Sequence, residues 1–217
     1  MKDLSNIVLV SDMDGTLLDS MKFWRFAALE YMMKKHIPIS EDALAGVFRR
    51  SARETVSIAY RDAGLSDADI SPDLGKDILK IVDVRYDNDV HPKDGALEYI
   101  KKLHEHGIRC CVATATQKDH AMKVLRKFGF DKYIEFVFDT DDAGCSKAHE
   151  QFFTLVADKL SVPIDECVMY EDALYSIRTA KKVGMHVVAI EDECAITGRT
   201  EIKELADVYI KEFSELL

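Results

Sequence analysis

Short apolar runs rich in β-branched residues alternate along most of this chain with longer amphipathic segments. We predict strands at 7–11, 109–114, 136–138, 167–170, 186–190 and 207–210. Helices are predicted between the later strands, at 92–106, 118–128, 148–160 and 174–183. This order predicts an α/β fold, a Rossmann-like parallel sheet with helices on both faces. Such a sheet carries its functional residues at the carboxyl ends of its strands.

The segment 20–89 interrupts this alternation directly after the first predicted strand. It contains four predicted helices and no strand between them, at 22–36, 41–49, 52–63 and 72–86. We therefore expect a second, small all-helical domain at 20–89, inserted into a parallel-sheet core made of 1–19 and 90–217.

The charge balance excludes several classes of partner. Lys and Arg number 29 against 39 Asp and Glu, so the net charge is −10. Binding to nucleic acid or to an anionic membrane needs a basic face, so neither partner is expected. No apolar run approaches the roughly 20 residues of a membrane span, and the first residues lack an export signal. The five cysteines show no metal-binding spacing, which indicates a reduced, cytoplasmic protein. No protein partner is inferred.

Two aspartates follow the first predicted strand in the sequence DMDGT at 12–16. Carboxylates as close as those of Asp12 and Asp14 raise each other's pKa above the usual value of about 3.9 unless a cation lies between them. The alternative interpretation is a solvated acidic turn, because Asp-Gly is itself a common turn sequence.

Three further polar motifs lie at predicted strand ends or helix starts. Thr114 ends the strand 109–114, Lys147 opens the helix 148–160, and Glu171 and Asp172 follow the strand 167–170. Each has an ordinary alternative: a threonine that merely suits a strand, a solvated lysine, and a solvated acidic turn.

Taken together and in this order, the four motifs resemble those of the haloacid dehalogenase (HAD) superfamily, in its phosphatase and β-phosphoglucomutase-like branch with a helical cap. The resemblance implies that Asp12 is the nucleophile, which forms an aspartyl-phosphate. It implies that Asp14 is the general acid and base. Thr114 and Lys147 would then bind the phosphoryl group and assist its transfer.

The resemblance also implies a metal site. Asp12, Asp172, Glu171 and the backbone carbonyl of Asp14 would hold Mg²⁺, a hard cation that prefers such oxygen ligands. The chain departs from the family pattern in three places. No proline follows Lys147, and Ala173 and Ser176 replace the usual Ser and Gly.

These implications favour a Mg²⁺-dependent phosphomonoester hydrolase acting on a small phosphorylated metabolite such as a sugar phosphate. The first alternative is a phosphosugar mutase of the β-phosphoglucomutase type. Arg53, near Arg49 and Arg50, stands where the mutases hold a substrate-binding arginine, whereas Trp24 stands where they carry a histidine. The second alternative is a non-enzymatic phosphorylatable switch that resembles response-regulator receivers, but these are shorter and lack a cap.

Overall fold

The computed structural model of this chain describes residues 7–47 and 52–217. Its residues divide into a core unit, Met1–Asp19 with His91–Leu217, and a helical unit, Ser20–Val90. The chain leaves the core unit at Asp19 and returns at His91, where the Asp19 N–H donates to the His91 carbonyl at 2.9 Å. The helical unit is therefore an insertion that begins and ends at neighbouring points of the core unit.

The core unit is built on a six-stranded sheet in the order β3-β2-β1-β4-β5-β6, in which every pair of neighbours is parallel. Its strands are β1 (Val8–Ser11), β2 (Arg109–Ala113), β3 (Val137–Phe138), β4 (Cys167–Glu171), β5 (His186–Ile190) and β6 (Val208–Ile210). The predicted parallel α/β sheet is confirmed. Because β1 lies between β2 and β4, residues that follow these three strands meet at one edge of the sheet.

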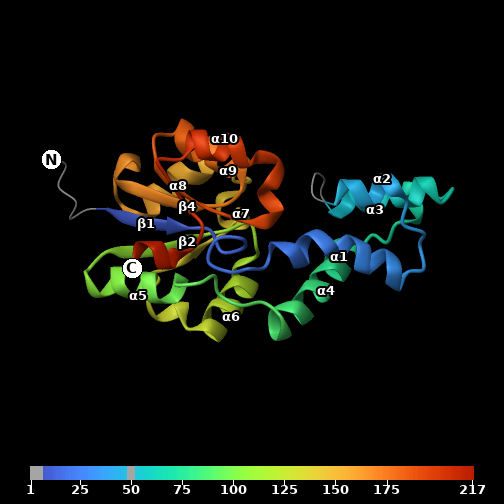
Figure 1. Cartoon of the computed structure of the whole chain (residues 1–217), viewed down its shortest axis with the longest axis horizontal. Coiled ribbons are helices and arrows are strands. Elements are labelled where there is room, and N and C mark those ends of the chain that lie inside the picture. The colour runs from blue at the N-terminus through green and yellow to red at the C-terminus, as the bar shows by residue number, and fades with distance from the viewer. Residues whose placement is uncertain (1–6, 48–51) are drawn as a thin grey trace. The chain divides into compact units, whose positions relative to one another are not determined.

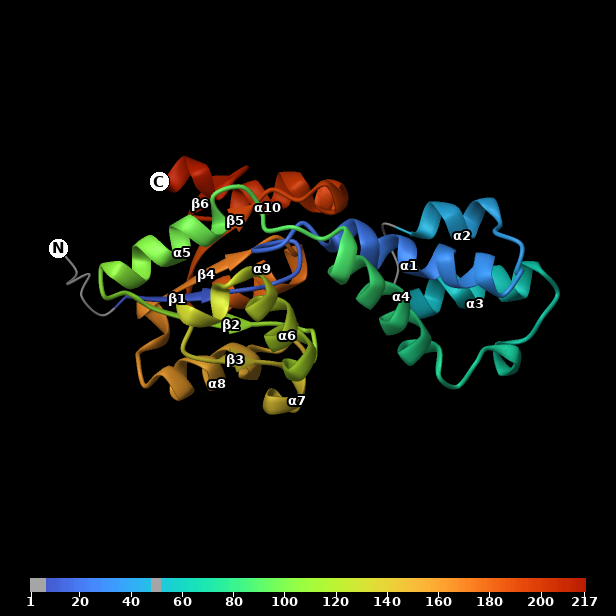
Figure 2. The ribbon, with the colours of Figure 1, turned by 90° about the horizontal axis from the view of Figure 1, so that it is seen from below.

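Helices cover both faces of this sheet (Figure 1). They are α5 (Ala96–Glu105), α6 (Lys118–Phe128), α7 (Thr140–Ala143), α8 (Glu150–Leu160), α9 (Leu174–Lys182) and α10 (Arg199–Leu205). Figures 1 and 2 show α5 and α6 on one face and α8, α9 and α10 on the other. The second face holds a buried cluster in which Val10 of β1 packs with Met169 of β4 and with Phe152 and Phe153 of α8. Alternate strand residues thus fill each face, as the pleat requires.

Short 3₁₀ turns connect these elements, at η3 (Phe130–Lys132), η4 (Ile164–Glu166), η5 (Glu193–Gly198) and η6 (Phe213–Leu216). Two predicted helix starts in the core unit were wrong. The helix predicted at 92–106 begins at Ala96, because Gly95 precedes it with φ 73°. The helix predicted at 148–160 begins at Glu150, so Lys147 lies in the turn before the helix rather than at its start.

The helical unit contains α1 (Met21–Lys34), α2 (Glu41–Gly46), α3 (Ala52–Asp62), η2 (Asp67–Asp69) and α4 (Leu74–Asn88). Its own apolar core includes Tyr31 and Met32 of α1, Val56 of α3 and Ile81 of α4. Trp24 of α1 is half-buried, and its indole N–H donates to the Tyr86 hydroxyl of α4 at 2.9 Å. This tryptophan therefore ties two helices of the same unit together.

Across the part of the chain that the structure describes, no helix has the length and apolar character that crossing a bilayer requires.

Candidate active site

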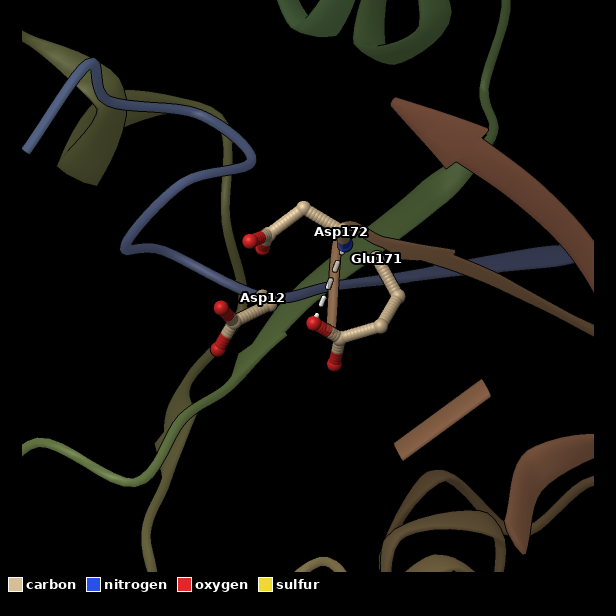
Figure 3. A group of neighbouring side chains, drawn as sticks. All are labelled: Asp12, Glu171 and Asp172. Carbon is tan, nitrogen blue, oxygen red and sulfur yellow. Dashed lines mark hydrogen bonds between the residues drawn. The ribbon is translucent and has the colours of Figure 1, made fainter. Parts of the chain in front are cut away.

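Asp12 lies at the carboxyl end of the central strand β1, buried beside β4. Its backbone N–H donates to the Tyr170 carbonyl at 3.0 Å, so the β1–β4 pairing continues one residue past Ser11. This places the Asp12 carboxylate beside those of Glu171 and Asp172, which end and follow β4 (Figure 3). Two predicted motifs that are about 160 residues apart in the sequence are thus neighbours, as expected for adjacent parallel strands.

Lys147 joins two of these carboxylates. Its Nζ lies 2.8 Å from Asp12 Oδ1 and 2.5 Å from Glu171 Oε2, and its side chain is only 2% exposed. Burial alone would lower the pKa of Lys147, but the charges of Asp12 and Glu171 raise it well above its usual value. The ammonium is therefore permanently charged and held against the Asp12 carboxylate.

Glu171 accepts hydrogen bonds at both of its carboxylate oxygens. Oε1 accepts the backbone N–H groups of Asp172 at 3.1 Å and Ala173 at 3.0 Å. Oε2 accepts from the Lys147 ammonium and from the buried Ser176 hydroxyl at 2.6 Å. The carboxylate is thus fixed in one orientation, from which it holds Lys147. Ser176 was noted in the sequence only as a departure from the family pattern, and here it has a specific partner.

The carboxylates of Asp12, Glu171 and Asp172 each offer an oxygen within 4.8 Å of the others, and all three residues are buried. Burial, together with the neighbouring carboxylates, raises the pKa of Asp12 to about 7 against the partly compensating charge of Lys147. Burial and the other two acids also raise the pKa of Asp172, opposed by Lys93. Closely spaced buried carboxylates favour a bound cation, and their oxygens suit a hard divalent ion. The donor set therefore fits a divalent metal.

The loop that carries Asp14 is folded back onto the edge of the sheet where the three acids lie. Gly15 adopts φ 84°, a conformation that favours glycine, and its N–H donates to the Leu18 carbonyl at 2.9 Å. The next residue, Thr16, is buried and donates its hydroxyl to Asp172 Oδ1 at 3.1 Å. Thr16 therefore links the loop after β1 to the acid that follows β4, a contact that the sequence analysis did not identify.

Two threonines follow β2 and face this loop. The Thr116 N–H donates to Thr114 Oγ1 at 3.1 Å. A hydroxyl that accepts in this way can still donate its own hydrogen, as a contact to a phosphoryl oxygen would require. Thr116 in turn donates its hydroxyl to Asp14 Oδ2 at 2.7 Å. Thr114 was predicted from the sequence and Thr116 was not, although their spacing of two residues matches that of Asp12 and Asp14.

The structure thus brings six predicted site residues to one edge of the sheet in the core unit: Asp12, Asp14, Thr114, Lys147, Glu171 and Asp172. Arg53 belongs to the other unit, where it is exposed on α3. Arg49 and Arg50, the rest of the predicted basic cluster, lie outside the described residues.

Comparison with known proteins gives consistent matches over nearly the whole chain. The family model for haloacid dehalogenase-like hydrolases matches residues 8–184. A validoxylamine A 7'-phosphate phosphatase from Streptomyces hygroscopicus subsp. limoneus is 24% identical over 96% of this chain and 95% of its own length. A fructose-1-phosphate phosphatase from Escherichia coli (strain K12) is 28% identical over 84% of this chain and 95% of its own length.

Solved structures show the same fold. An Entamoeba histolytica HAD hydrolase of family IA, variant 3, superposes with a TM-score of 0.79 at 20% identity, covering 96% of this chain and 94% of that one. A candidate β-phosphoglucomutase from Thermotoga maritima superposes with a TM-score of 0.72 at 20% identity, covering 94% of each chain.

Proposed function

Since this chain belongs to the haloacid dehalogenase-like hydrolases and is a phosphatase of that family, we propose that it is a Mg²⁺-dependent hydrolase of small phosphate monoesters, sugar phosphates in particular. The observation that carries this proposal is the buried Asp12 carboxylate, held by Lys147 and next to Asp172. A charged nucleophile, a fixed ammonium and a metal-binding acid at one point are what transfer of a dianionic phosphoryl group needs. The fructose-1-phosphate phosphatase among the relatives supports the choice of sugar phosphates as substrates.

In the first half-reaction, an oxygen of Asp12 attacks phosphorus while the bond to the leaving oxygen breaks. Asp14 gives its proton to that leaving oxygen, so the alcohol departs neutral. Lys147 faces Asp12 and would balance the negative charge of the transferring group, and the Thr114 hydroxyl would donate to one of its oxygens.

In the second half-reaction, Asp14 removes a proton from a water molecule that attacks the phosphorus of the aspartyl-phosphate. The bond between phosphorus and the Asp12 oxygen breaks, inorganic phosphate leaves, and both aspartates return to their starting states. The same residue therefore serves first as acid and then as base.

The carboxylates of Asp12 and Asp172 and the backbone carbonyl of Asp14 would hold the Mg²⁺ ion, with Glu171 within reach. When bound, the ion offsets the charge of the acids and draws the substrate phosphate toward Asp12. Glu171 contributes mainly by orienting Lys147, because its oxygens already accept four hydrogen bonds.

The raised pKa of Asp12 predicts a pH-dependent stabilisation by Mg²⁺. In the metal-free protein the folded state binds a proton at Asp12 up to about pH 7, whereas the ordinary pKa is 3.8. The stability that this group contributes is therefore present at low pH and lost as the pH rises from 3.8 to about 7. A bound Mg²⁺ would take the place of this proton, so the difference in Tm between loaded and metal-free protein should widen by several degrees from about pH 5 to about pH 8. Differential scanning calorimetry with Mg²⁺ or EDTA measures it, and a constant difference contradicts a metal at Asp12.

A panel of phosphorylated metabolites tests the proposed activity directly. The protein is incubated with Mg²⁺ and each compound, and released inorganic phosphate is measured, with EDTA as the control. We expect release from at least one sugar phosphate and its loss in EDTA. No release from any monoester would contradict the proposal.

The reaction products distinguish a hydrolase from a mutase. Two observations make a mutase worth testing. One is the structural similarity to a candidate β-phosphoglucomutase, and the other is the predicted role of Arg53. Glucose 1-phosphate with a bisphosphate primer should give free phosphate if the chain is a hydrolase. An isomerised sugar phosphate without free phosphate would identify a mutase.

The cysteines support a location in the reducing cytoplasm. None of the five forms a disulfide in the structure, and burial raises the pKa of Cys110 to about 12 and that of Cys167 to about 11. Such thiols are poorly reactive and pack as small apolar side chains. We therefore propose that the protein is cytoplasmic.

A further inference from the structure

We propose that Thr116 positions Asp14 for proton transfer to the leaving group, and that it acts through its hydroxyl rather than by touching the substrate. This inference rests on the proposed role of Asp14. The carrying observation is the 2.7 Å hydrogen bond from Thr116 Oγ1 to Asp14 Oδ2.

The bond lies where it can control the orientation of Asp14. Both partners are buried, with Thr116 9% and Asp14 8% exposed. A hydrogen bond between buried groups meets little competition from water. It also restricts rotation of the Asp14 carboxyl group.

The backbone holds Thr116 itself in place. Its N–H donates to Thr114 Oγ1, and Thr114 N–H donates to the Phe138 carbonyl at 2.9 Å, so the segment stays anchored to β3. Because β1 and β2 are neighbours with Ser11 opposite Val112, the segments that follow these strands begin side by side, and the Thr116 hydroxyl reaches Asp14. One short segment therefore places the Thr114 hydroxyl at the predicted phosphoryl position and the Thr116 hydroxyl at Asp14.

The effect of losing this hydrogen bond on the rate depends on the leaving group. An alkyl alcohol leaves only when protonated, so its departure depends on a correctly aimed Asp14. The nitrophenolate ion is a stable leaving group that needs little protonation. A wrongly oriented Asp14 should therefore slow the hydrolysis of alkyl phosphates selectively. A general packing defect would slow the hydrolysis of both substrates to the same degree.

The test compares kcat/KM for two substrates, because this ratio reports the steps through departure of the leaving group. The substrates are p-nitrophenyl phosphate and the alkyl phosphate from the panel that the unmodified protein hydrolyses fastest. Thr116→Val keeps the shape and removes the hydroxyl. We expect kcat/KM for the alkyl phosphate to fall about 10- to 100-fold. For p-nitrophenyl phosphate the loss should stay below about threefold.

Two variants serve as controls on the hydroxyl. Thr116→Ser keeps the hydroxyl donor, so its kcat/KM for the alkyl phosphate should lie within about threefold of the value for the unmodified protein. Thr154→Val makes the same change at an exposed helix position and should leave both substrates unaffected. Partial unfolding of Thr116→Val lowers both rates equally and cancels in the substrate ratio, and Thr116→Ala gives an independent second reading of that ratio.

Asp14→Asn separates the inference from the proposed function. It should reduce the alkyl rate relative to the aryl rate by at least as much as Thr116→Val. If Asp14→Asn shows this selectivity and the Thr116 variants slow both substrates equally, or neither, the inference is wrong and the proposed function stands. If Asp14→Asn shows no selectivity, the assignment of Asp14 as the acid is wrong as well.

Discussion

Replacing Asp12 with asparagine is expected to abolish turnover, with kcat reduced by about 10⁴-fold or more. The amide has nearly the same shape as the carboxylate but lacks the charge and the nucleophilic oxygen. Lys147 keeps its 2.5 Å contact with Glu171, so the local structure should persist. Removing one of three clustered buried acids also reduces their repulsion, so the metal-free protein should be no less stable than the unmodified one.

Phosphate release and thermal unfolding, measured on the same samples, check this expectation. Asp158→Asn makes the same change at an exposed position of α8 and should leave both quantities unchanged. Activity of Asp12→Asn within about tenfold of the unmodified protein would show that another group attacks phosphorus.

Replacing Lys147 with methionine should give the second-largest loss, about 10³-fold in kcat. Methionine fills a similar volume but leaves Asp12 and Glu171 facing each other without the ammonium. Removing one partner from a buried ionic network typically costs about 3–5 kcal/mol, so the free energy of unfolding should fall as well. Mg²⁺ should recover part of that stability and little of the activity, because the metal cannot take the position of Nζ.

Chemical denaturation with and without Mg²⁺, together with phosphate release, measures both effects. Lys101→Met, at an exposed position of α5, is the matched control and should change neither. If Lys147→Met hydrolyses the same substrates at an unchanged rate, the ammonium has no role in transfer, and its burial between two acids serves folding alone.

The strand ends were the most predictable part of the molecule. Apolar runs next to Asp12, Thr114 and Asp172 indicated three strands, and parallel strands bring their carboxyl ends to one edge. Local sequence thus predicted which motifs would meet. It did not predict that Lys147 would bind Glu171 as well as Asp12, because that contact depends on the turn before α8.

The hydroxyls that contact the site carboxylates could not be predicted from the sequence. Thr16, Thr116 and Ser176 each donate to a site carboxylate. Threonine and serine occur in turns and helix starts for many reasons, so their identity alone carries little information. Only the packing of three separate loops at one sheet edge gives each hydroxyl a specific partner.

Short helices were missed for a related reason. Neither α7 nor α10 was predicted, since four and seven residues are too few to show a clear helical period. The helical unit was easier, because longer segments such as α1 and α4 show the period over several turns.

The stereochemical course at phosphorus tests the covalent role of Asp12 most directly. A phosphorothioate monoester made chiral with oxygen isotopes is hydrolysed in water enriched in the third isotope, and the configuration of the released thiophosphate is determined. Transfer to Asp12 and then to water inverts phosphorus twice, so we predict net retention. Net inversion would mean that water displaces the alcohol in a single step, and would contradict an intermediate on Asp12.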